Sequence, residues 1–202
     1  MSVVPRLIHL NGAPGVGKST LSRRYGADHP GVLICDIDVL RTMVAGWEGD
    51  FHEAGARIRS AALAGITAYL ASGHDVVVPQ LVGRASELDR FRAAALAADA
   101  AYVGVLLTAT PDVVVERFRE RTARAPEDPL VRTVTDVVEG LGGDSLLIDT
   151  THALEDLATE HHLLRVIASD LESTYAALLR VLGETTRGQG NAGVEDPGPR
   201  ST

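Results

Sequence analysis

The sequence predicts an α/β protein in which a parallel sheet is covered by helices on both faces. Five short apolar runs, each followed by a polar or Gly/Pro turn, alternate with stretches of helical periodicity. Strands that are apolar throughout and separated by helices are typical of parallel sheets with two buried faces. A glycine-rich segment directly after the first run supports the same class. The expected strands are Pro5–Leu10, Val32–Cys35, Val76–Val78, Tyr102–Leu107 and Leu146–Ile148.

Helices are expected between these strands. Residues 19–25 follow the first strand, and residues 58–69 carry one apolar stripe at helical spacing. A near capping box opens a helix at Ser86. Two further helices begin with a capping residue followed by proline, at Thr110 and Asp128. The last helical region is expected from about residue 153 to 182, broken at most once.

The glycine-rich segment matches the pattern G-x-x-x-x-G-K-[ST] of phosphate-binding loops. Its glycines let successive backbone N–H groups point at phosphate oxygens, and the helix that follows adds its positive end. Lys18 is the only lysine among 19 basic residues, and a compact ammonium suits the β- and γ-phosphates. The hydroxyl of Ser19 is expected to bind Mg²⁺. We therefore expect ATP to be bound by Gly12, Ala13, Pro14, Gly15, Val16, Gly17, Lys18, Ser19 and Thr20.

Length and composition narrow the class of protein. The chain has 202 residues, 45% of them hydrophobic, which suits one packed domain over residues 1–183. Residues 184–202 have little to bury, so we expect a disordered tail. No apolar run approaches the ~20 residues of a membrane span, and the single cysteine, Cys35, is expected in the core of a cytoplasmic protein. The net charge of −8 argues against a long nucleic-acid surface.

Two acids follow the second expected strand, where ligands bind in sheets of this kind. Asp36 and Asp38 should lie on one side of an extended backbone, with Ile37 turned away. One acid then suits Mg²⁺, and the other suits a proton from an attacking hydroxyl. We assign the metal to Ser19 and Asp36 and the proton to Asp38. A purely structural alternative is that Asp38 caps a helix over residues 39–45.

The turn after the third expected strand carries Gln80 and Arg84. Many phosphate-loop ATPases have an acid here for Mg²⁺, so Gln80 argues against a motor or AAA-type ATPase. Gln80 and Arg84 are candidates for contacts with a substrate. A turn stabilised by Gly83 explains the segment nearly as well.

Arginines crowd the helix after the fourth expected strand. Arg117, Arg121 and Arg124 share one helical face and precede a proline-rich stretch. We expect a lid over about residues 117–130 that closes on ATP and stabilises the transferring phosphoryl group. The alternative is a solvated helix of Glu–Arg pairs. Residues 149–152, Asp-Thr-Thr-His, are expected after the last strand, near an adenine or simply at the surface.

Together the phosphate loop, the acid pair and the arginine helix resemble the shikimate kinase and chloramphenicol phosphotransferase group over roughly residues 5–180. The resemblance implies an adenylate-kinase-like P-loop NTPase fold. It also implies a metal acid at Asp36 and a substrate-binding or catalytic acid at Asp38, and a final strand that ends at residues 149–152. The stretch from His74 to Gln80 resembles uncharacterised bacterial AAA-domain ATP-binding proteins. The glycine motif that binds shikimate is missing, so shikimate is not the expected acceptor.

From these features we expect a cytoplasmic ATP- and Mg²⁺-dependent kinase that acts on a hydroxyl of a small molecule, an antibiotic or a metabolite. Lys18, Asp38 and the lid arginines are the expected catalytic residues. A regulatory or toxin-like ATP-binding protein and a nucleoside or polynucleotide kinase remain alternatives. A GTPase is excluded because its guanine-reading motif needs a second lysine. Side chains after the acid pair are candidates for the acceptor pocket or for ordinary packing: Trp47, Phe51, His52, Arg57 and Arg59.

Overall fold

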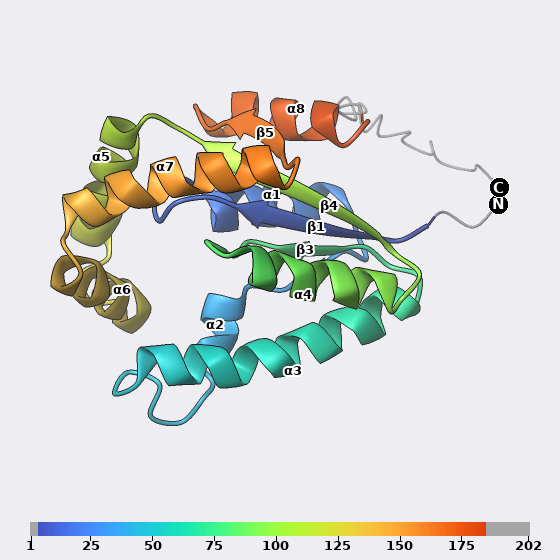
Figure 1. Ribbon diagram of the computed structural model, residues 1–202, viewed down its shortest axis with the longest axis horizontal. Coiled ribbons are helices and arrows are strands. Elements are labelled where there is room, and N and C mark those ends of the chain that lie inside the picture. The colour runs from blue at the N-terminus through green and yellow to red at the C-terminus, as the bar shows by residue number, and fades with distance from the viewer. Residues whose placement is uncertain (1–3, 185–202) are drawn as a thin grey trace, which may run out of the picture.

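A single parallel sheet of five strands, with the order β2-β3-β1-β4-β5, forms the centre of the protein (Figure 1). The computed structural model describes residues 4–184. The predicted fold class is confirmed, and four of the predicted strands overlap strands of the sheet. The strands are β1 Arg6–Asn11, β2 Leu33–Ile34, β3 Val76–Val78, β4 Ala101–Thr108 and β5 Leu164–Ile167.

Helices cover both faces of the sheet because successive residues of each strand point to opposite sides. Leu7 and Val76 pack toward α3, α4 and α7, whereas Ile8 and Val77 pack toward α1 and α8. None of the helices within residues 4–184 is both long and apolar enough to cross a bilayer. The helices are α1 Lys18–Asp28, α2 Ile37–Arg41, α3 Phe51–Ala71, α4 Ala85–Leu96, α5 Pro111–Arg124, α6 Pro129–Gly140, α7 Asp144–Glu160 and α8 Leu171–Val181.

The position of the last strand differs from the prediction. Residues 146–148 lie inside α7, where Leu147, Thr151 and Leu154 form a buried face at helical spacing. A run of three apolar residues does not distinguish a strand from a helix, and here the longer period decides. The true fifth strand, β5, is a short edge strand in which only Val166 is buried. It divides the helical region expected over residues 153–182 into the end of α7 and α8.

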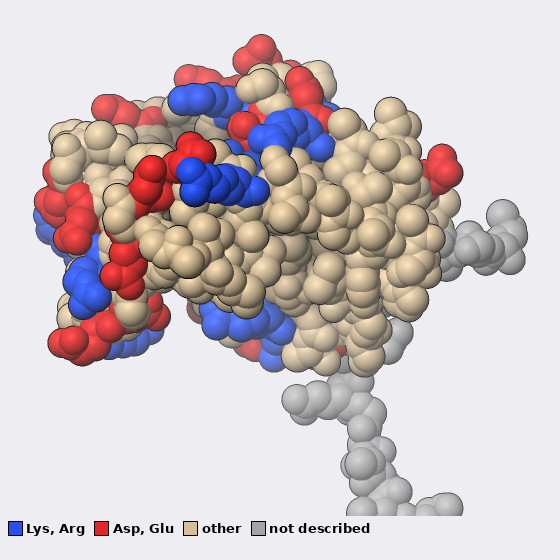
Figure 2. Space-filling model, turned by 90° about the horizontal axis from the view of Figure 1, so that it is seen from below, with Lys and Arg blue, Asp and Glu red and all other residues tan. Residues whose placement is uncertain are grey.

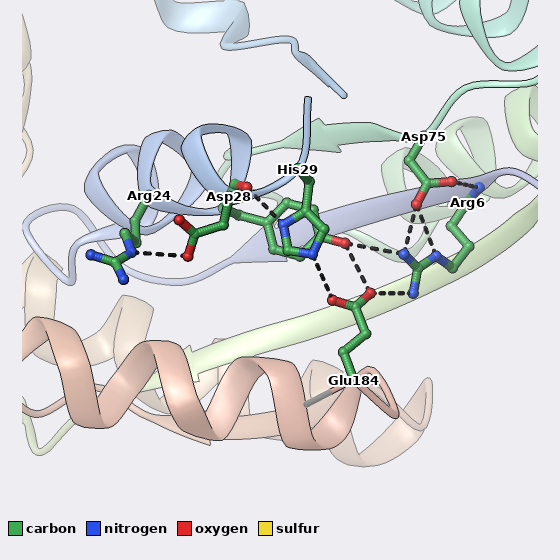
Figure 3. A network of polar contacts seen from close by, with 7 residues as sticks. Arg6, Arg24, Asp28, His29, Asp75 and Glu184 are labelled. Atoms are coloured by element: carbon green, nitrogen blue, oxygen red, sulfur yellow. Dashed lines mark hydrogen bonds and ion pairs between the residues drawn. The ribbon is translucent and has the colours of Figure 1, made fainter. Parts of the chain in front are cut away.

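A polar network joins four segments at the end of the sheet where β1 begins (Figure 3). Arg6 pairs with Asp75 at 2.7 Å and with Glu184 at 2.7 Å. Glu184 also accepts a hydrogen bond from the Tyr25 hydroxyl at 3.0 Å and lies 3.1 Å from His29 Nε2. Glu184 therefore belongs to the folded domain and not to the expected tail. Residues 185–202 lie outside the described part of the chain.

We expect Arg6→Ala to lower the free energy of unfolding by about 1–3 kcal/mol, because two partly buried carboxylates lose their cation. The control is Arg57→Ala, which removes an exposed pair with Glu53 on one helix and should cost at most about 0.5 kcal/mol. Urea unfolding of both variants measures the difference. Equal losses would show that the network contributes no more than a surface pair.

Candidate active site

Three glycines allow the backbone of the loop between β1 and α1 to bend tightly. Gly12, Gly15 and Gly17 have φ angles of 151°, 84° and 104°, in the region that side chains avoid. A Cβ added to Gly15 would lie 2.9 Å from the backbone nitrogen of Phe118, so the loop packs directly on α5. The loop therefore has the curled backbone that phosphate binding requires, and α5 supports it from behind.

Lys18 begins α1 and folds back over the loop. Its Nζ donates hydrogen bonds to the carbonyl oxygens of Gly12 at 2.8 Å and of Ala13 at 3.0 Å. Burial lowers the pKa of Lys18 to about 8, with Asp38 opposing this shift and Arg121 adding to it. A bound polyphosphate would favour the charged ammonium, which is the state that an anion site needs.

Ser19 and Asp36 meet at the position expected for a metal. The Ser19 Oγ donates a hydrogen bond to Asp36 Oδ2 at 2.9 Å. A hydroxyl and a carboxylate are hard oxygen donors, which suit Mg²⁺ held with phosphate oxygens and water. The residues present therefore fit the expected Mg²⁺ ion.

The acid that caps α2 is Asp36 and not Asp38. Asp36 Oδ1 accepts from the backbone N–H of Asp38 at 3.1 Å, and α2 begins at Ile37. The prediction that residues 36–38 are extended is therefore wrong, because α2 begins directly after Asp36. Asp38 lies in the first helical turn, and its side chain is 37% exposed. The alternative in which Asp38 serves only as a cap is thereby removed.

Arg41 orients Asp38. Its guanidinium lies 3.2 Å from Asp38 Oδ1 and 3.8 Å from the centre of the Phe51 ring. The residue is only 5% exposed, and burial lowers its pKa. Gly55 makes this burial possible, because a Cβ there would lie 2.8 Å from Arg41 Nη2. Arg41 was not predicted as a site residue, although a spacing of three residues from Asp38 on one helix indicates that the two side chains can pair.

The arginines expected in a lid lie on α5 and point to different partners. Arg117 donates hydrogen bonds to the carbonyl oxygens of Ala168 at 3.2 Å and Ser169 at 2.7 Å, after β5. Arg121 is half-buried and near enough to Lys18 to lower its pKa. Arg124 ends the helix and is exposed. Of the three, Arg121 is therefore the one placed toward the phosphate loop, and closure of residues 117–130 stays a prediction.

A buried polar layer beneath the loop was also missed. Asn11 is fully buried and exchanges hydrogen bonds of 2.8 and 2.9 Å with the backbone of Val82. His9 Nε2 bonds to the carbonyl oxygen of Gln80 at 2.9 Å, and Nδ1 bonds to the Tyr102 hydroxyl at 2.9 Å. A carbonyl only accepts, so Nε2 carries the proton of the neutral ring. A polar residue inside an apolar strand was the available signal for both.

Other expected site residues lie apart from this cluster. Residues 149–152 form part of α7 and do not end a strand, so the resemblance misplaced them; His152 is exposed. Gln80 is buried beside His9, whereas Arg84 is exposed. Cys35 is buried as expected, and burial raises its pKa to about 11.

The residues proposed for the acceptor side have mixed surroundings. Trp47 is 9% exposed, and Arg59 pairs with Glu87 at 2.8 Å. His52 and Arg57 are exposed. Phe51 lies under Arg41, so it supports Asp38 indirectly. Of this group, only Phe51 has a described contact that leads to the acid pair.

The fold and the phosphate loop define the class of this protein: a small α/β protein with a phosphate-binding loop after the first strand. A family model, the AAA domain, matches residues 7–139, and the chain belongs to that family. No curated protein sequence matches it.

Solved structures share this fold. A gluconokinase from Sinorhizobium meliloti 1021 is 22% identical with a TM-score of 0.55, over 88% of this chain and 94% of that one. A proposed kinase from Chloroflexus aurantiacus is 19% identical with a TM-score of 0.60, over 91% and 100%. The tunicamycin resistance protein of Deinococcus radiodurans is 17% identical with a TM-score of 0.58, over 90% and 97%. At these identities the likeness concerns the fold.

The contact between Gly55 and Arg41 predicts opposite effects of two alanine substitutions in α3. Gly55→Ala should lower the free energy of unfolding by about 1–3 kcal/mol, because the new methyl group overpacks the Arg41 site. Gly65→Ala has open space around its Cβ and should raise it by about 0.5–1 kcal/mol through helix propensity. Urea unfolding measures both, and equal stabilisation would show that Arg41 is not confined.

His9 predicts a pH dependence of stability. Burial lowers its pKa to about 4, so below its ordinary pKa of 6.5 the unfolded chain binds a proton that the folded chain does not. Stability should therefore fall as pH drops from 6.5 to 4, by at most about 3 kcal/mol from this group. His9→Gln should remove that component, whereas His52→Gln, an exposed control, should keep it. Parallel wild-type and His9→Gln curves of unfolding free energy against pH would contradict the assignment.

Proposed function

We propose that this protein is an ATP-dependent phosphotransferase that moves the γ-phosphate of ATP to a hydroxyl of a small molecule. The observation that carries the proposal is that three groups lie together beyond the carboxyl ends of β1 and β2. These are Lys18 on the curled loop, the Ser19–Asp36 pair of oxygen donors, and the half-exposed carboxylate of Asp38.

In the proposed reaction, Asp38 accepts the proton of the acceptor hydroxyl while the hydroxyl oxygen attacks the γ-phosphorus in line. The bond from this phosphorus to the bridging oxygen breaks, and ADP leaves with that oxygen. Lys18 and Arg121 stabilise the negative charge on the transferring group. Mg²⁺ held by Ser19 and Asp36 would neutralise charge on the β- and γ-phosphates. Arg117 and Arg124 complete the proposed lid.

The position of Asp38 favours a kinase over a regulatory ATP-binding protein. A protein that only binds ATP does not need a partly exposed carboxylate that is held by a buried arginine and lies close enough to Lys18 to raise its pKa. The net charge of −8 favours a small acceptor over a polynucleotide. The names of two proteins with the same fold, a gluconokinase and a tunicamycin resistance protein, are compatible with either a metabolite or an antibiotic as acceptor.

The test is transfer of labelled γ-phosphate to a library of alcohols, nucleosides, sugars and antibiotics by the wild-type protein and three variants. Lys18→Ala should abolish transfer and weaken MgATP binding, because no other lysine can replace its charge. Asp38→Asn should keep MgATP binding but lose roughly 10²–10⁴-fold in transfer, the usual share of a general base. Asp89→Asn, an exposed acid that pairs with Arg92, is the control and should behave as wild type.

Two results would contradict the proposal. Near-normal transfer by Asp38→Asn would exclude this residue as the base. ATP turnover without transfer to any acceptor, unchanged in Asp38→Asn, would favour a simple ATPase or a regulatory protein.

A further inference from the structure

A pocket of about 590 Å³ opens beside the edge strand β2. It is bounded by α1 on one side and by α2 and α3 on the other. Ser19 and Asp36 form one end of it, so the pocket begins at the proposed metal pair. Its size lies within the range of sites that hold drug-sized molecules.

The walls of the pocket are apolar. Leu33 and Ile34 of β2 and Leu40 of α2 face Ile58 and Ile66 of α3 across it. These side chains belong to, or pack against, the hydrophobic cores on the two faces of the sheet. The pocket is therefore a place beside the edge strand β2 where core side chains are not covered by other residues. An apolar ligand that displaces water here gains free energy in proportion to the area it buries.

Small residues of α3 keep the pocket open. Ala61, Ala62 and Gly65 line it, and a Cβ added to Gly65 would meet nothing within 4 Å. No charged residue occurs between Ser60 and Gly73. Figure 2 shows the molecule from below, the side on which α3 lies in Figure 1, with most charged side chains at the left and along the upper part and a broad, mostly uncharged area at the centre right. The part of the pocket lined by β2 and α3 therefore offers no ionic partner, and the charged residues of the lining are Arg23 and Asp36.

The polar end makes the pocket asymmetric. Ser19 and Asp36, which are hydrogen-bonded to each other, supply polar groups to the lining. Arg23 also lines the pocket, and its Nε donates a hydrogen bond to the Ser19 carbonyl oxygen at 2.8 Å. A ligand complementary to this shape has an apolar body and a hydroxyl at one end.

We infer that this pocket holds the apolar body of the phosphoryl acceptor, so that the acceptor is an amphiphilic alcohol and not a polyhydroxylated sugar or sugar acid. This inference rests on the proposed function. The acceptor hydroxyl lies beside Asp36, which lines the pocket, whereas the proposed base Asp38 lies outside the lining, two residues along the chain and hydrogen-bonded through its backbone N–H to Asp36. The hydrophobic walls determine which acceptor binds, whereas the phosphate loop and the metal pair contact the phosphates and do not distinguish between acceptors.

The test uses a series of primary alcohols from 1-butanol to 1-decanol and one variant that fills the pocket. Binding to the wild-type protein with MgADP, measured by calorimetry, should tighten about fourfold for each added methylene until the pocket is full. Gly65→Leu places a side chain in the open space and should weaken binding of the longer alcohols at least tenfold. Ala61→Leu, at a second lining position, should act in the same direction.

Ala64→Leu is the matched control, because Ala64 is exposed on the same helix and does not line the pocket. It should bind the alcohols as wild type does. Thermal unfolding and MgATP binding of each variant verify that the domain and the phosphate loop are intact. In the transfer assay, Gly65→Leu should raise the KM for long alcohols more than it lowers kcat.

Affinity that does not depend on chain length, or that is equal in wild type and Gly65→Leu, would overturn the inference. Transfer to polyols alone, unchanged in Gly65→Leu, would overturn it and leave the proposed function standing. Chain-length-dependent binding without transfer to any alcohol or library compound would instead refute the kinase function and, with it, the acceptor role. Self-association abolished by Gly65→Leu, without alcohol binding, would assign the pocket to an interface between copies.

Discussion

The hydrogen bond between Ser19 and Asp36 is the contact on which the geometry of the site depends. It joins the end of the phosphate loop to the end of β2, two segments that the sheet order separates by β3. The other oxygen of the same carboxylate accepts a hydrogen bond from the backbone N–H of Asp38 and so fixes the first turn of α2, which carries Asp38. One acid therefore links the proposed metal position to the orientation of the proposed base.

Buried charge around this contact is tolerated because each group has a specific partner. Lys18 folds onto two loop carbonyls, and Arg41 pairs with Asp38 over an aromatic ring. His9 avoids charge altogether and stays neutral between a carbonyl and a hydroxyl. Removing one partner of such a buried group costs more than the contact itself is worth, because the other partner is left desolvated. Asn11 and His9 in the polar layer under the loop are therefore each held by two or more hydrogen bonds, an arrangement that suits a preorganised anion site.

In the proposed site, the phosphate loop and the apolar pocket have separate roles, since the loop binds phosphate and the pocket binds the acceptor. The loop is built from backbone groups and recognises phosphate whatever the rest of the ligand carries. The walls beside β2 are built from side chains at an uncovered sheet edge, so changes in α3 alter them without disturbing the loop. A family with a common fold can therefore differ in acceptor through residues such as Gly65, and the name of one relative does not transfer to another.

The sequence by itself determined the phosphate loop, the class of fold, four of the strands and the proline-led starts of α5 and α6, because each depends on neighbouring residues. Glycine positions, apolar runs and capping pairs act over a few residues and can be read directly. Tertiary structure alone decided which of two short apolar segments became the fifth strand. Leu146–Ile148 pack as part of a helix, and Leu164–Ile167 gain hydrogen bonds from the edge of β4. It also decided that Arg41 is buried against Gly55 and that an apolar pocket remains open beside β2. These features arise from contacts between segments far apart in the chain, whose packing no local pattern records.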